Sequence, residues 1–188
     1  FSWQKAMGGE GGHGVLILSP RAVERLETFT PPRPLPKIFR LTKGGKLIEG
    51  IFAGETINTP SMFCVADAVD ALDWMEGIGG LVATRARADA NAAAVQAWVD
   101  RTDWVENLVA TPAARSNTSV CLSIVDPAIA GLDEAAQRDF VKKLTKLLES
   151  EGVAFDIGGY RDAPPGLRIW CGTTVETADV AALLPWLD

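Results

Sequence analysis

The chain has few of the residues that usually bind metals or form disulfide bonds. It contains one histidine, His13, and three widely spaced cysteines with no CxxC pair: Cys64, Cys121 and Cys171. A structural zinc site uses four ligands at short paired spacings, so we expect no metal site. An odd number of cysteines among apolar neighbours indicates reduced thiols in a hydrophobic core.

Basic residues and long apolar runs are also scarce. The 188 residues include 18 Lys and Arg against 24 Asp and Glu, which gives a net charge of −6. Proteins that bind nucleic acid usually carry an excess of positive charge, so no nucleic-acid partner is expected. No apolar run approaches the roughly 20 residues of a membrane-spanning helix, and the N-terminus lacks the pattern of a secretory signal. We therefore expect a soluble protein without a membrane partner.

The two ends lack the features of a complete chain. The first residue is Phe1, and the last residues are LLPWLD, in which Pro185 could begin a helical turn that does not continue. We expect a piece of a longer chain. Its hydrophobic content of 47% is enough for a core in one large domain or two small ones.

Apolar periodicity predicts a strand and a helix near the N-terminus. Residues 14–20 (GVLILSP) form a short apolar run typical of a buried strand, and residues 21–29 have apolar side chains at helical spacing. Four prolines between residues 31 and 36 predict an extended surface segment. The glycines of residues 39–56 predict a loop or hairpin.

Two long helices are expected between residues 60 and 100. The first would begin at Pro60 with Thr59 as its N-cap, and would end at the glycine pair 79–80. One face of it would be apolar, marked by Met62, Val65, Val69, Leu72 and Met75. The second, alanine-rich helix would connect to the residues that follow.

Residues 102–188 have the pattern of a small independent domain. An amphipathic helix is predicted between Asp133 as N-cap and Gly152 as terminator. Its inward side chains would be Phe140, Leu144, Leu147 and Leu148. Strands are predicted at residues 118–126, 153–157 and 167–171, and a final helix at residues 177–184. Alternating strands and helices indicate an α/β or α+β fold.

Lys5 is the first candidate for chemistry. It lies between a Trp-Gln pair and the glycine-rich residues 8–14 (GGEGGHG), a crowded place for a charge that is costly to desolvate. A lysine with a lowered pKa can attack a carbonyl as the neutral amine and form a Schiff base. The glycines would let backbone approach a planar cofactor. The alternative is an ordinary exposed lysine at the end of a loop.

Asn58 and Thr59 are the second candidates. At the start of a helix, two polar side chains and free backbone N–H groups together suit a phosphate. Alternatively, Thr59 is a simple N-cap without a ligand.

Arg161 and Arg168 are the third candidates. Arg168 alternates with apolar neighbours on its predicted strand, so its side chain should point to the opposite face, and Arg161 precedes a rigid Asp-Ala-Pro-Pro turn. Two guanidinium groups suit a substrate with two anionic groups. The alternative is a pair of surface arginines that form ion pairs with Asp156 or Asp162.

Two further motifs are given structural interpretations. The glycine-rich residues 8–14 do not end in Gly-Lys-Ser/Thr and precede their strand, unlike a phosphate-binding Walker loop. Without a nucleophile motif beside it, His13 is expected to form structural hydrogen bonds. The KGGK segment at residues 43–46 is expected to be a solvated turn.

Several segments together resemble one enzyme family. They are SWQK with GGEGGHG, FRLTKGGKLIEGIF, GETINTPSM, RSNTSVCL and YRDAPPGLRIWCG. In this order they resemble the C-terminal half of phosphoserine aminotransferase, over essentially the whole chain. The resemblance implies a cytoplasmic homodimer of fold-type I that depends on pyridoxal phosphate. Residues 1–101 would then be the end of the large cofactor-binding domain with its connector helix, and residues 102–188 the small C-terminal α+β domain.

The resemblance also implies an activity and the residues that perform it. The family transfers an amino group from glutamate to 3-phosphohydroxypyruvate in serine biosynthesis, and a related 4-phosphooxy substrate serves vitamin B6 synthesis in some organisms. Lys5 would form the Schiff base with the cofactor and move the proton between substrate Cα and the cofactor, and Gln4 would touch the cofactor. Asn58 and Thr59 would reach its phosphate across the dimer interface.

For the substrate, the resemblance implies that Arg168 binds the α-carboxylate and that Arg161 helps to bind the phosphate. Many relatives have His-Arg where this chain has Tyr160-Arg161, and the spacing from this pair to Arg168 is one residue longer here than in those relatives. We therefore assign no role in phosphate binding to Tyr160. The family's upstream half would supply the ring stacked on the cofactor and the Asp at its pyridine nitrogen. We therefore expect no transamination from these 188 residues alone.

Other interpretations keep the same fold. An enzyme of alanine-glyoxylate aminotransferase or cysteine desulfurase type would differ in substrate. A non-catalytic domain would have kept the fold and lost the cofactor, although Lys5 together with Arg168 argues against it.

Overall fold

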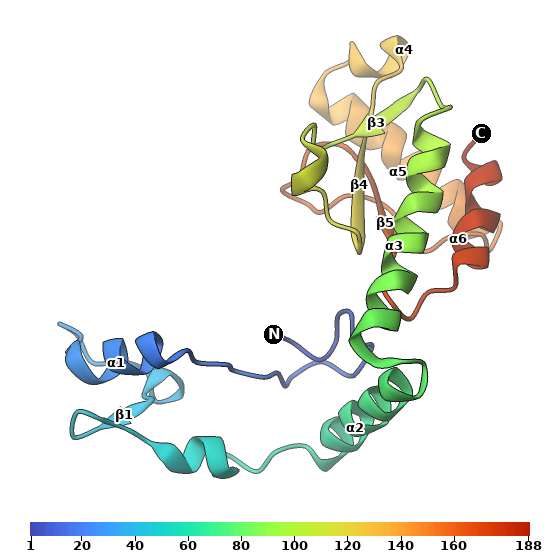
Figure 1. The fold of residues 1–188 in the computed structure, drawn as a ribbon. Coiled ribbons are helices and arrows are strands. Elements are labelled where there is room, and N and C mark those ends of the chain that lie inside the picture. The colour runs from blue at the N-terminus through green and yellow to red at the C-terminus, as the bar shows by residue number, and fades with distance from the viewer. The chain divides into compact units, whose positions relative to one another are not determined.

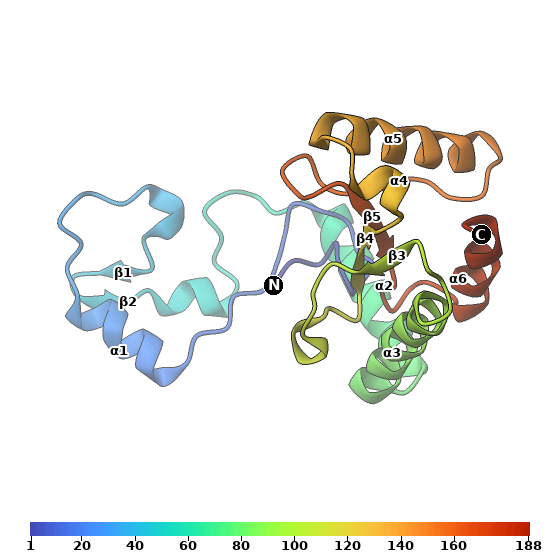
Figure 2. The same ribbon diagram turned by 90° about the horizontal axis from the view of Figure 1, so that it is seen from above.

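The computed structural model describes all residues, Phe1–Asp188. By its internal contacts the chain divides into two units. Unit 1 comprises residues 1–4 and 9–70, and unit 2 comprises residues 5–8 and 71–188. Figures 1 and 2 show the elements of both units. None of the helices is both long and apolar enough to cross a membrane.

Unit 1 is built from short elements. They are α1 (Pro20–Thr28), the 3-10 helix η1 (Lys37–Phe39), the antiparallel strands β1 (Thr42–Lys43) and β2 (Lys46–Leu47), η2 (Glu49–Ala53) and the start of α2 (Met62–Gly77). Helix α1 begins after Ser19, whose Oγ accepts a hydrogen bond from the amide of Ala22 at 3.2 Å. Gly44 and Gly45 have positive φ angles of 59° and 74°, which suits a two-residue hairpin turn. The predicted helix and hairpin are both confirmed.

Glu27 connects α1 to the hairpin. Its carboxylate accepts hydrogen bonds from the amide of Leu47 at 3.0 Å and from Lys46 Nζ at 3.1 Å. These two donors, the backbone amide first, lower the pKa of Glu27 below its ordinary value of 4.5.

The predicted strand at residues 14–20 is wrong for this chain. The segment joins no sheet, and its one bridge pairs Gly14 with Ser2. The side chain of Ile17 is 77% exposed. An apolar run forms a strand only where a partner strand continues its hydrogen bonds, and here the pairing stops after the two bonds that Val15 exchanges with Phe1.

The helix predicted from Pro60 begins two residues later than expected. Ser61 Oγ accepts a hydrogen bond from the amide of Cys64 at 3.3 Å, which is the geometry of an N-cap, so Thr59 is not the cap. Serine caps a helix at least as well as threonine, and proline at residue 60 then lies outside the helix. On the predicted apolar face, Met62 is 76% exposed and Val69 and Leu72 are exposed too, while Val65 and Met75 are half-buried.

Unit 2 contains the sheet and the longer helices. They are the rest of α2, α3 (Gly80–Val99), β3 (Val105–Asn107), η3 (Pro112–Ala114), β4 (Ser119–Ile124), α4 (Pro127–Ala130), α5 (Glu134–Ser150), β5 (Gly166–Trp170), α6 (Thr177–Leu183) and η4 (Leu184–Trp186). The sheet is antiparallel in the order β3-β4-β5. In both views α3 and α6 lie side by side (Figures 1 and 2).

The hydrophobic core lies between one face of this sheet and the helices of unit 2. Leu122 of β4 and Leu167 of β5 are directly paired and fully buried, and Trp98 of α3 and Leu148 of α5 belong to the same buried cluster. The glycine pair at residues 79–80 was predicted to end one helix, but α2 ends at Gly77, and Gly79 is the N-cap and Gly80 the first residue of α3.

Two predictions in this unit need correction. On α5, whose cap Asp133 is confirmed by its hydrogen bond from Ala136, Leu147 is exposed and Val141 is buried instead. Residues 153–157 form no strand, because only the carbonyl of Ile157 meets β5, where it accepts from the Arg168 amide at 2.7 Å. One hydrogen bond beside β5 does not make a ladder.

Candidate functional site

Lys5 lies in a tight turn of unit 2. Its carbonyl accepts a hydrogen bond from the amide of Gly8 at 2.9 Å, and its exposed side chain forms no ion pair. Gly8 has a φ of 76°, and a Cβ there would come within 2.7 Å of Thr174 Cγ2. Glycine therefore lets this turn lie directly against the segment that follows β5.

The glycine-rich residues that follow Lys5 are fixed against the start of α2 within unit 1. The amide of Glu10 donates to the Asp67 carboxylate, and Cys64 Sγ donates to the carbonyl of Gly11 at 3.6 Å. His13 Nε2 accepts from the amide of Ser61 at 3.2 Å, while Nδ1 lies 3.0 Å from the carbonyl of Gly12. The structural role predicted for His13 is confirmed.

Gln4, Asn58 and Thr59 all belong to unit 1, and all three are exposed. Asn58 and Thr59 lie four and three residues before Met62, the first residue of α2, and neither side chain forms a hydrogen bond within the chain. The Gln4 carboxamide lies over Gly11: a Cβ added to Gly11 would come within 2.5 Å of Gln4 Oε1. Two unpaired polar side chains ahead of a helix leave donors available for an anion.

Arg168 is held on the face of β5 that points away from the core. Its strand neighbours Leu167 and Ile169 are buried, so the orientation predicted from alternation is confirmed. Arg168 Nη2 donates to Asp156 Oδ2 at 3.1 Å, and the guanidinium carbon lies 4.3 Å from the ring centre of Tyr160. The Nε atom is buried without a hydrogen-bond partner.

Arg161 is in a different environment. It is exposed and lines a hollow of about 240 Å³ with Arg138 and Lys142 of α5, whereas Arg168 does not line it. Tyr160 borders the hollow and also stacks on Arg168. The sequence reasoning did not single out Arg138 and Lys142, although their spacing of four residues on a helix places them on one face.

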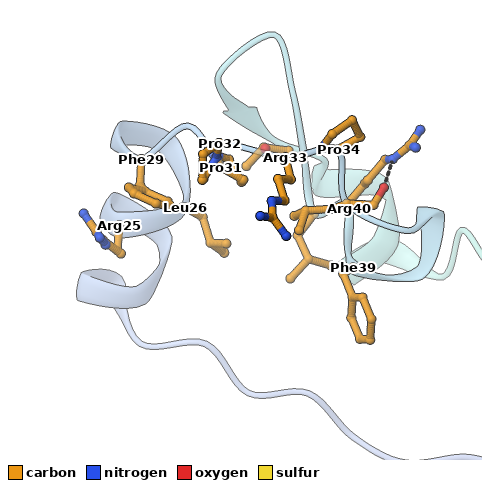
Figure 3. A pocket seen from close by; sticks show the side chains of 12 residues that line it. Arg25, Leu26, Phe29, Pro31, Pro32, Arg33, Pro34, Phe39 and Arg40 are labelled. Atoms are coloured by element: carbon orange, nitrogen blue, oxygen red, sulfur yellow. Dashed lines mark hydrogen bonds between the residues drawn. The ribbon is translucent and has the colours of Figure 1, made fainter.

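A second hollow, of about 500 Å³, lies in unit 1 around the proline-rich segment (Figure 3). Its lining is Arg25, Leu26, Phe29, Pro31, Pro32, Arg33, Pro34, Leu35, Phe39, Arg40, Leu41 and Thr42. None of the predicted site residues lines this hollow, so it does not bear on the candidate site.

Taken one by one, the candidate residues have the chemical groups that an aldehyde cofactor with a phosphate requires. Lys5 offers a primary amine free of ion pairs, as a Schiff base requires. Asn58 and Thr59 have unpaired polar groups of the kind that bind a phosphate. The glycines after Lys5 have no side chains that would obstruct a planar cofactor.

Comparison with known sequences finds similar proteins but no matching family model. No family model matches the chain. Phosphoserine aminotransferase of Methanosarcina mazei is 52% identical over 188 residues, which are 100% of this chain and 48% of that protein. Phosphoserine aminotransferase of Methanosarcina barkeri is 53% identical over the same 188 residues and 48% of its own length. The chain thus spans about half the length of the curated relatives that it matches.

Solved structures show the same fold. A phosphoserine aminotransferase from Cytophaga hutchinsonii aligns with a TM-score of 0.73 at 20% identity, over 100% of this chain and 47% of that one. A phosphoserine aminotransferase from Trichomonas vaginalis, solved with bound pyridoxal phosphate, aligns with a TM-score of 0.62 at 21% identity, over 73% of this chain and 36% of that one. The whole chain is thus similar in sequence to about half of a phosphoserine aminotransferase, and its fold is that of the C-terminal portion of those chains.

Proposed function

We propose that the full-length protein is a pyridoxal-phosphate-dependent phosphoserine aminotransferase of serine biosynthesis. It would transfer the amino group of glutamate to 3-phosphohydroxypyruvate and release phosphoserine and 2-oxoglutarate. The observation that carries this proposal is the 52% identity to a phosphoserine aminotransferase along all 188 residues. Because the chain spans 48% of that relative, the activity is assigned to the whole protein.

In this proposal Lys5 and three polar residues hold the cofactor. The Lys5 amine would hold the cofactor at its aldehyde carbon and, when free of that bond, would move the proton at the substrate Cα, and Gln4 would contact the cofactor. Asn58 and Thr59 donate hydrogen bonds to its phosphate from the other subunit. When bound, pyridoxal phosphate supplies an electron sink for the charge that develops at the substrate Cα.

The two arginines would orient the substrate. Arg168 binds the α-carboxylate, because its buried Nε and its Nη2 offer the parallel donors that a carboxylate accepts. Arg161 helps to bind the substrate phosphate. Its hollow supports an anion at this place, because Lys142 and Arg161 line it without an ion pair, beside Arg138, which pairs with Glu134.

The remaining proposals concern the domain boundaries, the assembly and the location of the protein. Residues 1–101 would form the end of the large domain, and residues 102–188 the small domain. The contact division at residues 70 and 71 reflects only the contacts within these 188 residues. We also propose a cytoplasmic homodimer with no nucleic-acid or membrane partner, in agreement with the net charge of −6.

The direct test replaces the proposed Schiff-base lysine. In the full-length protein, Lys5→Ala should abolish transamination between glutamate and 3-phosphohydroxypyruvate and remove the absorbance of the lysine-bound cofactor. Lys43→Ala, in the exposed hairpin of unit 1, is the matched control and should keep both. A Lys5→Ala protein with wild-type turnover would refute the role of Lys5. A wild-type enzyme that prefers alanine with glyoxylate, or cysteine, would refute the substrate assignment.

A further inference from the structure

Asp156 has an unusual backbone conformation. It is the one non-glycine residue with a positive φ, at 54°. Aspartate enters this left-handed region more readily than most residues, yet a non-glycine residue stays there only where its surroundings hold it. In this conformation its carboxylate meets the Nη2 of Arg168.

Arg168 and Asp156 differ sharply in their exposure. The side chain of Arg168 is 20% exposed, covered in part by the Tyr160 ring, while that of Asp156 is 91% exposed. Asp156 can therefore turn into solvent at little cost, whereas Arg168 stays in place. The pair leaves Nε of Arg168 buried and unpaired, so Asp156 satisfies the guanidinium only in part.

We propose, on the basis of the proposed function, that Asp156 is a counter-ion of Arg168 which the substrate carboxylate must displace. A carboxylate bound through both Nε and Nη2 would satisfy the buried donor that Asp156 leaves free, and would take the Nη2 that Asp156 occupies. Asp156 thereby weakens the affinity for both carboxylate substrates and keeps the empty arginine from holding other anions. It acts through Arg168 and lowers the affinity for every carboxylate that binds there.

The test is Asp156→Asn in the full-length enzyme loaded with cofactor. Asparagine also tolerates the left-handed region and has the same shape, so only the charge is lost. Because an exposed ion pair is weak, the KM for glutamate and for 3-phosphohydroxypyruvate should fall about two- to fivefold with kcat unchanged. Succinate, a dicarboxylate that cannot be transaminated, should bind more tightly by the same factor in calorimetric titration.

Two further variants make the result specific. Asp156→Gly, which fits the same backbone without a carboxylate, should reproduce the effect of Asp156→Asn. Asp162→Asn is the matched control, since this exposed carboxylate forms no ion pair with Arg168, and it should change neither KM nor succinate affinity. An unchanged or weaker affinity in Asp156→Asn would overturn the inference.

Arg168→Gln separates this inference from the proposed function. If Arg168→Gln folds like the wild type by circular dichroism and keeps its succinate affinity, the assignment of the carboxylate site fails, and the inference fails with it. If Arg168→Gln loses succinate binding while Asp156→Asn behaves like the wild type, only the inference fails. If the wild type has no aminotransferase activity but Asp156→Asn binds succinate more tightly, the counter-ion role holds and the proposed function fails.

Discussion

Burial sets the reactivity of the three free thiols at the scale of single residues. Cys171, directly after β5, is fully buried, and the desolvation raises its pKa from 9.0 to about 11. Cys64 and Cys121 are only half-buried. The thiolate is the reactive form of a cysteine. A rise of two units in the pKa lowers the fraction of Cys171 present as thiolate at pH 8 about a hundredfold.

We therefore expect iodoacetamide at pH 8 to label Cys64 and Cys121 well before Cys171. Peptide mass spectrometry after a short pulse measures the three rates within one sample, so Cys121 on the neighbouring strand serves as the internal control. In urea all three should react alike, because the burial of Cys171 is lost. Equal rates in the native protein would contradict the burial of Cys171.

The orientation of Arg168 could be predicted from sequence, but its partner could not. Alternation with Leu167 and Ile169 is enough to place Arg168 on the opposite face of a strand. The sequence offers both Asp156 and Asp162 as ion-pair partners. The choice depends on the left-handed backbone at Asp156, which a non-glycine residue adopts only in a particular tertiary context.

At the scale of elements, Asn91 connects α3 to the segment between β5 and α6. Its side chain is fully buried, and Nδ2 lies 3.2 Å from the carbonyl of Gly172 and 3.0 Å from that of Val175. Its Oδ1 accepts from Thr177 Oγ1 at 2.6 Å. A buried polar network of this kind stabilises the fold only while every member has a partner.

Asn91→Ala should lower the free energy of unfolding of the 188-residue chain by about 2–3 kcal/mol, because buried carbonyls lose their donor. Asn91→Asp should cost more, since a carboxylate would then face carbonyl oxygens. Asn117→Ala, which loses one exposed hydrogen bond to Asp89, is the matched control and should change the value by less than about 0.5 kcal/mol. Urea unfolding followed by circular dichroism measures all three, and a neutral Asn91→Ala would refute the role of the network.

Elements with local signals were predictable, and those that depend on distant partners were not. Helix α5 could be bounded by Asp133 and Gly152, which act within one turn of the helix ends. The start of α2 could not, because Thr59 and Ser61 are both suitable caps and only contacts decide between them. Residues 14–20 have the composition of a strand, but composition does not show whether a partner strand is present.

At the scale of the whole molecule, hydrophobic burial is distributed very unevenly. The buried hydrophobic cluster lies entirely between Val95 and Leu187, in unit 2. In unit 1 the one buried hydrophobic residue is Ala68, while the side chains of Ile17, Phe39 and Phe63 are exposed. Apolar burial is the main favourable term in folding, so unit 1 has little stabilisation of its own.

Hydrogen exchange should reveal this asymmetry. In the isolated 188-residue chain we expect slow exchange in α3, α5 and β4 and rapid exchange in α1 and the β1–β2 hairpin, because local opening is easiest where few apolar side chains are buried. The same chain should show no aminotransferase turnover, since the similar phosphoserine aminotransferase of Methanosarcina mazei is about twice as long. In the full-length protein α1 and the hairpin should become protected, as additional chain covers the exposed apolar side chains. Slow exchange of α1 in the isolated chain would show that unit 1 is stable without that additional chain.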